Sequence, residues 1–137
     1  MYKKGICFLL IFCFISIYFI GCSQTKNMTE EQKKDIDFTI CHEENLPKEL
    51  KELIEKEKEK PFQLSYTTKE YSYIVVGYGE QTMGGYSIQV TALYETEHQV
   101  VIETNLKGPN PSEEKQGVSY PYLVAKIQNP DKTISFR

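Results

Sequence analysis

The chain has 137 residues, of which 40% are hydrophobic and 26% are charged, and its formal net charge is −3. This length favours one domain with a hydrophobic core of its own. The acidic balance and the lack of a polybasic cluster argue against nucleic-acid binding and against electrostatic docking to anionic lipid.

The first 21 residues have the layout of a secretory signal peptide. They begin with Lys3 and Lys4, continue as an apolar run from Ile6 to Ile20, and end in a small residue. As a helix this run of 15 residues spans roughly 22 Å, whereas the hydrocarbon core of a membrane is about 30 Å thick. We therefore expect a signal-peptide helix over residues 1–21 that is removed by cleavage. An uncleaved anchor is the alternative.

The stretch FIGCS around Cys22 resembles the lipobox of bacterial lipoproteins, with Phe19 in place of the usual leucine. In that class the cysteine thiol receives a diacylglyceryl group and becomes the first residue of the mature protein. Two acyl chains hold a protein on a bilayer where one chain would be marginal. The resemblance implies that Cys22 is lipidated and anchors the protein to the cell membrane, on its extracytoplasmic face. The alternative is an ordinary signal peptide followed by a chance cysteine.

The remaining cysteines and histidines predict neither a disulfide framework nor a metal site. Only Cys41 stays free once the leader is removed and Cys22 is alkylated. We interpret Cys41 as a small strand residue, and His42 beside it would point to the opposite face of that strand. His42 and His98 lack neighbours at metal-ligand spacing, so no metal and no cofactor are expected.

Residues 22–34 comprise the lipidated cysteine and a polar segment without periodicity, which predicts a flexible tether. Residues 35–137 are then a single extracytoplasmic domain. In residues 35–40, DIDFTI, the apolar side chains of Ile36, Phe38 and Ile40 alternate with polar ones. This pattern predicts one half-buried strand.

One amphipathic surface helix is predicted between Asn45 and Pro61. Asn45 or Leu46 can cap it, Pro47 suits its first turn, and Pro61 stops its continuation. Its apolar stripe recurs at helical spacing and consists of Leu46, Leu50, Leu53 and Ile54. The charged run that follows is interpreted as the solvated side of the helix.

After Pro61 the apolar period changes from that of a helix to that of strands. Six segments show it, namely residues 62–66, 71–78, 86–94, 99–106, 122–127 and 133–136. In the third segment the predicted common face holds Tyr86, Ile88, Val90, Ala92 and Tyr94. The fold class is therefore α+β, mainly β: an antiparallel sheet or sandwich of about six to seven strands, with the helix covering an open face or edge.

A glycine-rich stretch, GYGEQTMGGYS, covers residues 77–87. A phosphate-binding loop would need a following Lys-Ser/Thr pair and a helix N-terminus, and this stretch instead enters a strand. Nucleophile and general-base motifs are also missing from the sequence. We conclude that the protein is not an enzyme. The pair Gly84 and Gly85 suits a tight reversal, because glycine adopts positive φ at little cost.

The segment IVVGYGEQTMGGYSIQV, together with the later GPNP and SYPYLVAKI, resembles the PrcB C-terminal domain family over roughly residues 70–128. That family is named for a lipoprotein subunit of a bacterial surface protease complex. The residues that match its glycine loop are Gly77, Gly79, Gln81, Thr82, Gly84, Gly85, Tyr86 and Ser87, with Met83 inserted before the glycine pair. The distal match comprises Pro109, Pro111, Tyr120, Pro121 and Tyr122.

The resemblance implies a membrane-anchored, non-catalytic lipoprotein that binds, assembles or stabilises a protein partner, such as a secreted or surface protease. Two interpretations of the glycine loop stay open. It is either a hairpin turn whose Tyr86 plugs the end of the sheet, or a partner-contacting loop with Gln81, Thr82 and Met83 at its tip. The alternative function is a protease inhibitor that presents residues 79–86, similar to chagasin-like inhibitors.

Overall fold

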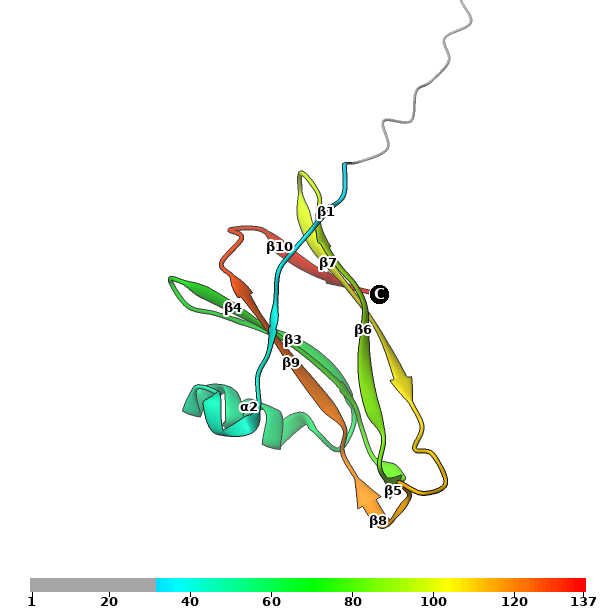
Figure 1. Cartoon of the computed structure of the whole chain (residues 1–137). Coiled ribbons are helices and arrows are strands. Elements are labelled where there is room, and N and C mark those ends of the chain that lie inside the picture. Colours follow the sequence, from blue (N-terminus) through cyan, green and yellow to red (C-terminus); the bar gives the residue numbers. More distant parts are fainter. Residues whose placement is uncertain (1–31) are drawn as a thin grey trace, which may run out of the picture. The chain divides into compact units, whose positions relative to one another are not determined.

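The computed structural model describes residues 32–137, so the predicted signal peptide and Cys22 lie outside the described residues. In this part of the chain ten strands and one α-helix form a helix-covered β-sandwich (Figure 1). The elements in chain order are β1 (Lys34–Asp35), β2 (Thr39–Ile40), the 3-10 turn η1 (Glu43–Asn45), α2 (Lys48–Glu57), β3 (Pro61–Thr67), β4 (Tyr71–Tyr78), β5 (Gln81–Gly84), β6 (Ser87–Glu95), β7 (Gln99–Lys107), β8 (Lys115–Ser119), β9 (Tyr122–Gln128) and β10 (Thr133–Phe136). The mainly β class with one helix is thus confirmed.

Two four-stranded sheets enclose the main core. Sheet A has the order β1-β6-β7-β10, sheet B has the order β2-β9-β4-β3, and β5 pairs with β8 in a separate two-stranded sheet. The side chains buried between sheets A and B are Ile74, Leu93, Val100, Ile102, Leu123, Ala125 and Ile127. Burying each larger aliphatic side chain contributes about 1.5–3 kcal/mol, so this layer is the main source of stability.

Helix α2 covers the other face of sheet B. Its buried residues Leu50 and Ile54, with Leu46 before the helix, pack against Val75 and Val124 of the sheet. The same layer is lined by partly buried side chains of Cys41, Phe62, Leu64, Tyr66, Tyr73 and Tyr122. The predicted surface helix over an open face is therefore present. Among residues 32–137, no helix has the length and apolar character needed to cross a membrane.

The prediction that Leu53 belongs to the buried apolar stripe of the helix was wrong. Leu53 is 41% exposed, whereas Leu50 and Ile54 are almost fully buried. The helix contacts one flat sheet face, so only a narrow row of positions reaches it, and Leu53 lies one residue beside that row. The stripe that holds the helix consists of Leu46, Leu50 and Ile54.

The single strand predicted for residues 35–40 was also wrong. β1 pairs with β6 in sheet A, β2 pairs with β9 in sheet B, and residues 36–38 cross from one sheet to the other. Because the chain changes sheets there, its apolar residues do not share a face. Ile36 packs against the core between the sheets, while Phe38 and Ile40 are 40% and 42% exposed.

The common face predicted for residues 86–94 is interrupted by a β-bulge. Val90 pairs with Thr104 but Ala92 pairs with Glu103, so Thr91 is an extra residue on β6. An extra residue inverts the alternation of side chains beyond it. Leu93, rather than Ala92 or Tyr94, therefore joins the core cluster between the two sheets with Ile88 and Val90.

The last strand departs from an all-antiparallel arrangement. β10 pairs in parallel with β7, from Thr133 opposite Gln99 to Phe136 opposite Ile102. The connection after β9 leaves sheet B and enters sheet A, with Asp131 at φ 51° in the intervening turn. After such a crossover the next strand can run parallel or antiparallel to its neighbour. The apolar period of a strand does not indicate which of these two directions it takes.

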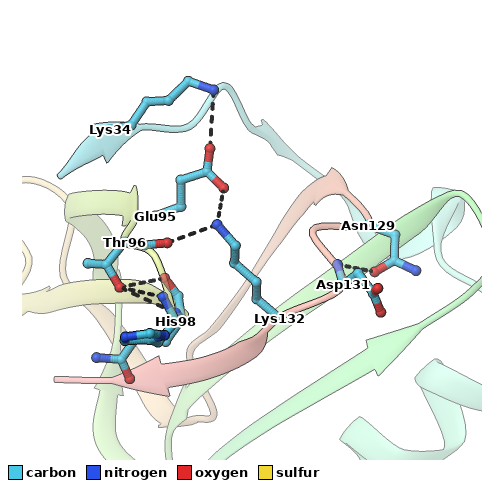
Figure 2. A network of polar contacts seen from close by, with 8 residues as sticks. Lys34, Glu95, Thr96, His98, Asn129, Asp131 and Lys132 are labelled. Carbon is cyan, nitrogen blue, oxygen red and sulfur yellow. Dashed lines mark hydrogen bonds and ion pairs between the residues drawn. The ribbon is translucent and has the colours of Figure 1, made fainter. Parts of the chain in front are cut away.

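Where the chain enters the sandwich, Lys34, Glu95 and Lys132 form a cluster of ion pairs, drawn in Figure 2, which we call the clasp. The Glu95 carboxylate accepts from Lys34 Nζ at 3.1 Å and from Lys132 Nζ at 3.0 Å, and Lys132 also donates to the Thr96 carbonyl. Lys33 Nζ lies 4.8 Å from the centre of the Tyr94 ring. The last residues of the predicted tether, Lys33 and Lys34, thus contact sheet A.

Glu95→Gln is expected to destabilise the protein at neutral pH and to have less effect in acid. The Lys132 and Lys34 hydrogen bonds hold the pKa of the Glu95 carboxyl below its ordinary value. A lowered folded-state pKa adds stability above the unfolded-state value, about 4.3, and that stability is lost as pH falls through the folded-state pKa. Thermal unfolding of both proteins from pH 7 to about pH 3 should show their melting temperatures converging. Exposed Glu97→Gln is the control, and a gap that does not narrow in acid would contradict the clasp.

Candidate functional site

The glycine-rich segment leaves sheet B at the end of β4, where Gly77 makes room for an aromatic ring. Gly77 is paired with Phe62 of β3, and a Cβ atom on Gly77 would lie 2.0 Å from that ring. The ring covers the glycine, an arrangement known to offset the loss of a side chain in a strand. On the next strand, Gly77 pairs with Tyr122. Gly77 is therefore a packing residue of the sheet.

Gly79 serves the sharp exit of the chain from the sheet. Its φ is +72°, and a Cβ atom there would lie 2.8 Å from Pro61. Just beyond it, the Gln81 side-chain amide donates to the Tyr78 carbonyl at 3.1 Å. The Tyr78 hydroxyl in turn lies 2.9 Å from Thr104 Oγ1 of sheet A. Gly79 and Gln81 fix the start of the segment rather than project from it.

Residues 81–84 form a strand and not the tip of a hairpin loop. β5 pairs antiparallel with β8, and the Ser119 hydroxyl donates to the Met83 carbonyl at 2.6 Å. Since β4 lies in sheet B and β6 in sheet A, this segment bridges the two sheets. We refer to β5 and β8 together as the arm. The predicted hairpin turn is therefore replaced by a crossover with its own strand.

The two adjacent glycines have different roles. Gly84 ends β5 at negative φ and pairs with Lys115 of β8, whereas Gly85 has a φ of +93°. A Cβ atom on Gly85 would lie 2.4 Å from the Glu113 carbonyl oxygen. Gly85 alone makes the reversal, and it does so against the loop that precedes β8. Tyr86 is half-buried, and its ring lies beside Gly108.

The arm carries a bulge that exposes an apolar side chain. Gln81 pairs with Ser119 and Met83 with Gln116, so β8 has one residue more than β5 in this interval. Gly117, at φ +102°, takes the bulge conformation with open space around it. Val118 is consequently 55% exposed, the largest exposure among the exposed large apolar side chains of the described residues. Thr82 on the facing strand is also exposed.

Two tyrosines lie where β8 leads into β9, at the base of the arm. The Tyr120 hydroxyl donates to Glu80 Oε2 at 3.3 Å, and Lys58 Nζ lies 5.6 Å from the Tyr120 ring centre. Partial burial raises the pKa of both Tyr120 and Tyr122, and nearby carboxylates raise each pKa further. Both phenols therefore stay protonated at neutral pH and contribute packing and hydrogen bonding.

Figure 1 shows the arm at one end of the sandwich and β1 at the opposite end. Of the predicted loop residues, the structure gathers Gln81, Thr82, Met83 and Gly84 on β5, while Gly77 and Gly79 lie at the exit from β4. Among Gln81, Thr82 and Met83, Thr82 is exposed and the other two are half-buried. The sequence interpretation missed β8 and Val118, although a glycine within an otherwise strand-like segment is a known sign of a bulge.

The other chemistry-bearing residues lie apart from the arm. Cys41 is a free, half-buried cysteine against the helix layer, and His42 is exposed beside it. Within residues 32–137, no group of three or more His, Cys, Asp or Glu side chains is arranged to hold a metal ion. The features gathered at the far end are thus backbone edges, an apolar side chain and small polar groups, which suit contact with a protein.

These features define a β-sandwich with a projecting two-stranded arm between its sheets. Residues 72–128 match the family described as PrcB C-terminal, and this segment belongs to that family. The match runs from β4 to the end of β9, so it includes the arm and excludes α2, β3 and β10. Comparisons with curated proteins and with solved structures gave no significant match.

Proposed function

We propose that the protein is a non-catalytic lipoprotein that binds a protein partner at the bacterial cell surface through the arm. The observation that carries this proposal is the exposed Val118 beside Thr82 on a two-stranded sheet whose outer edges are unpaired among the described residues. Unpaired strand edges and exposed apolar side chains are the features that peptide and protein partners use. The family of residues 72–128 supports a role as an assembly or stabilising subunit, with a surface protease as the partner.

The position of the arm fits an anchored protein. The chain enters the domain at Lys34, at the end of the sandwich opposite the arm (Figure 1). A lipid anchor at Cys22 would therefore leave the arm at the end of the domain remote from the tether. This supports an extracytoplasmic contact site that reaches away from the bilayer.

Cys22→Ala is expected to abolish lipid attachment and to release the protein from membranes or leave an uncleaved precursor. The thiol is the acylated atom in the proposed processing, and alanine has none. Metabolic labelling with a fatty acid, followed by membrane fractionation, measures the effect. Cys41→Ala is the matched control and should keep the label. Label retained on Cys22→Ala would contradict lipidation at this residue.

The partner contact is tested by affinity capture from detergent-solubilised membranes with the full-length, lipidated protein as bait. Val118→Glu places a charge on the bulge, and we expect the affinity for the captured partner to fall about tenfold, equivalent to about 1.4 kcal/mol, with a corresponding loss of capture. Leu53→Glu is the matched control, because Leu53 is another exposed apolar residue but lies on α2. Its capture should equal that of the unmodified protein. Equal losses for both variants would contradict contact through the arm.

Protease inhibition by residues 79–86 is less favoured by the geometry. An inhibitory loop must enter an enzyme cleft, whereas Gln81–Gly84 is paired with β8 and Gly85 is packed against the Glu113 backbone. The activity of the captured protease, measured with and without the purified protein, distinguishes a stabilising subunit from an inhibitor. A stabilising subunit should bind without blocking proteolysis.

A further inference from the structure

The outer strand of sheet B is long and open on one side. β3 has β4 as its neighbour, and within residues 32–137 no other strand pairs with it. Its seven residues, PFQLSYT, run in unbroken register with β4 and contain no charged side chain. Natural proteins usually protect such an edge with charges, bulges or short length. Here only Pro61, at the first position, offers protection.

The backbone groups that point outward from β3 follow from the ladder. The Thr68 N–H donates to the Tyr71 carbonyl at 2.8 Å, so this pair is hydrogen-bonded. Hydrogen-bonded and non-hydrogen-bonded pairs alternate along antiparallel strands. The N–H and C=O groups of Gln63, Ser65 and Thr67 therefore face away from β4. The Tyr78 N–H donates to the Pro121 carbonyl on the β9 side, so it points away from β3. Tyr78 and its β3 partner Pro61 are therefore a non-hydrogen-bonded pair, as this alternation requires.

We infer that a second copy of this chain pairs with β3, antiparallel and centred on Ser65. In that register Ser65 lies opposite Ser65 of the second copy, and Gln63 lies opposite Thr67. These are the positions whose backbone groups point outward, so the two strands exchange hydrogen bonds at all three pairs. Sheet B would become one eight-stranded sheet across a two-fold axis, since identical edges form an isologous interface.

The side chains of β3 are complementary to themselves in this register. Leu64 comes opposite Tyr66 of the other copy, and both are half-buried on the face that α2 covers. Cross-strand pairs of an aromatic and an aliphatic residue are favourable. An unrelated partner strand would have to supply this pattern, whereas a second copy already has it.

The inference is tested by disulfide cross-linking in membranes that contain the full-length protein. Ser65→Cys, in a Cys41→Ala background, is expected to give a covalent product of two copies on mild oxidation. Glu52→Cys on the exposed side of α2 is the matched control and should give little of this product. Gln63→Pro should suppress cross-linking at position 65, because it removes an outward N–H without removing a bond to β4.

Thermal unfolding of Gln63→Pro shows whether the variant is folded, and the Ser65→Cys result stands without it. No two-copy product from Ser65→Cys would overturn the inference. A product with a polypeptide of different mass would also overturn it and assign the edge to another protein. The capture experiment on the arm is independent, so the two proposals can fail separately.

Discussion

Leu50→Ala is expected to lower the free energy of unfolding by about 2–5 kcal/mol. Leu50 is fully buried and is the central contact of α2 with sheet B, where it packs with Leu46, Val75 and Val124. Removing its branched end leaves a cavity between two layers that cannot close without moving the helix. Chemical denaturation monitored by circular dichroism measures the change directly.

Leu53→Ala is the matched control on the same helix. Leu53 is 41% exposed, and alanine is the better helix former, so the expected change is within about 0.5 kcal/mol. The two substitutions remove the same atoms from positions three residues apart. Similar losses from both would contradict the packing of α2 on sheet B.

Gly85→Ala is expected to destabilise the fold through two separate costs. Positive φ costs an alanine about 1–2 kcal/mol, and overpacking in a tight site adds about 1–3 kcal/mol. At Gly85 both costs apply, because the new methyl group would meet the Glu113 carbonyl oxygen and the Pro109 side chain. The free energy of unfolding, measured by denaturation, should fall by about 2–5 kcal/mol in total.

Gly117→Ala separates these two costs. Gly117 has a similar φ, +102° against +93°, but a Cβ atom there would meet nothing within 4 Å. Its substitution should therefore cost only the conformational part, about 1–2 kcal/mol. If Gly117→Ala were as destabilising as Gly85→Ala, the packing of Gly85 against the loop before β8 would be wrong.

Much of the fold was predictable because local periodicity reflects which face of each element is buried. The alternation of residues 62–66 and 71–78 matches β3 and β4, and the stripe of Leu46, Leu50 and Ile54 matches the buried side of α2. In β3 and α2 one face meets one layer along the whole element, whereas β4 is covered on both faces and its apolar residues are nearly continuous. The apolar period of the sequence then indicates both the type of element and the face that it buries.

The errors arose where the chain changes layers. Residues 35–40 alternate like a single strand but pair with sheet A at one end and with sheet B at the other. The bulge at Thr91 inverts the buried face of β6, and no local residue preference marks it. Both features depend on contacts with strands distant in sequence, which periodicity does not report.

The sequence singled out the glycine-rich segment, but it did not predict the geometry of that segment. Glycines at positions 77–85 indicated unusual backbone, and the structure gives Gly79 and Gly85 positive φ. However, Gln81–Gly84 finds its partner strand more than 30 residues later, at Lys115–Ser119. A non-local pairing of this kind cannot be read from the glycine segment alone, and Val118 therefore escaped prediction.

The central claim is that the arm contacts a protein partner through the exposed Val118. The most direct measurement is the melting temperature and the capture yield of Val118→Glu on the same preparation. Val118 is 55% exposed on the bulge, so the melting temperature should stay close to that of the unmodified protein while capture is lost. An unchanged melting temperature together with undiminished capture would contradict the claim.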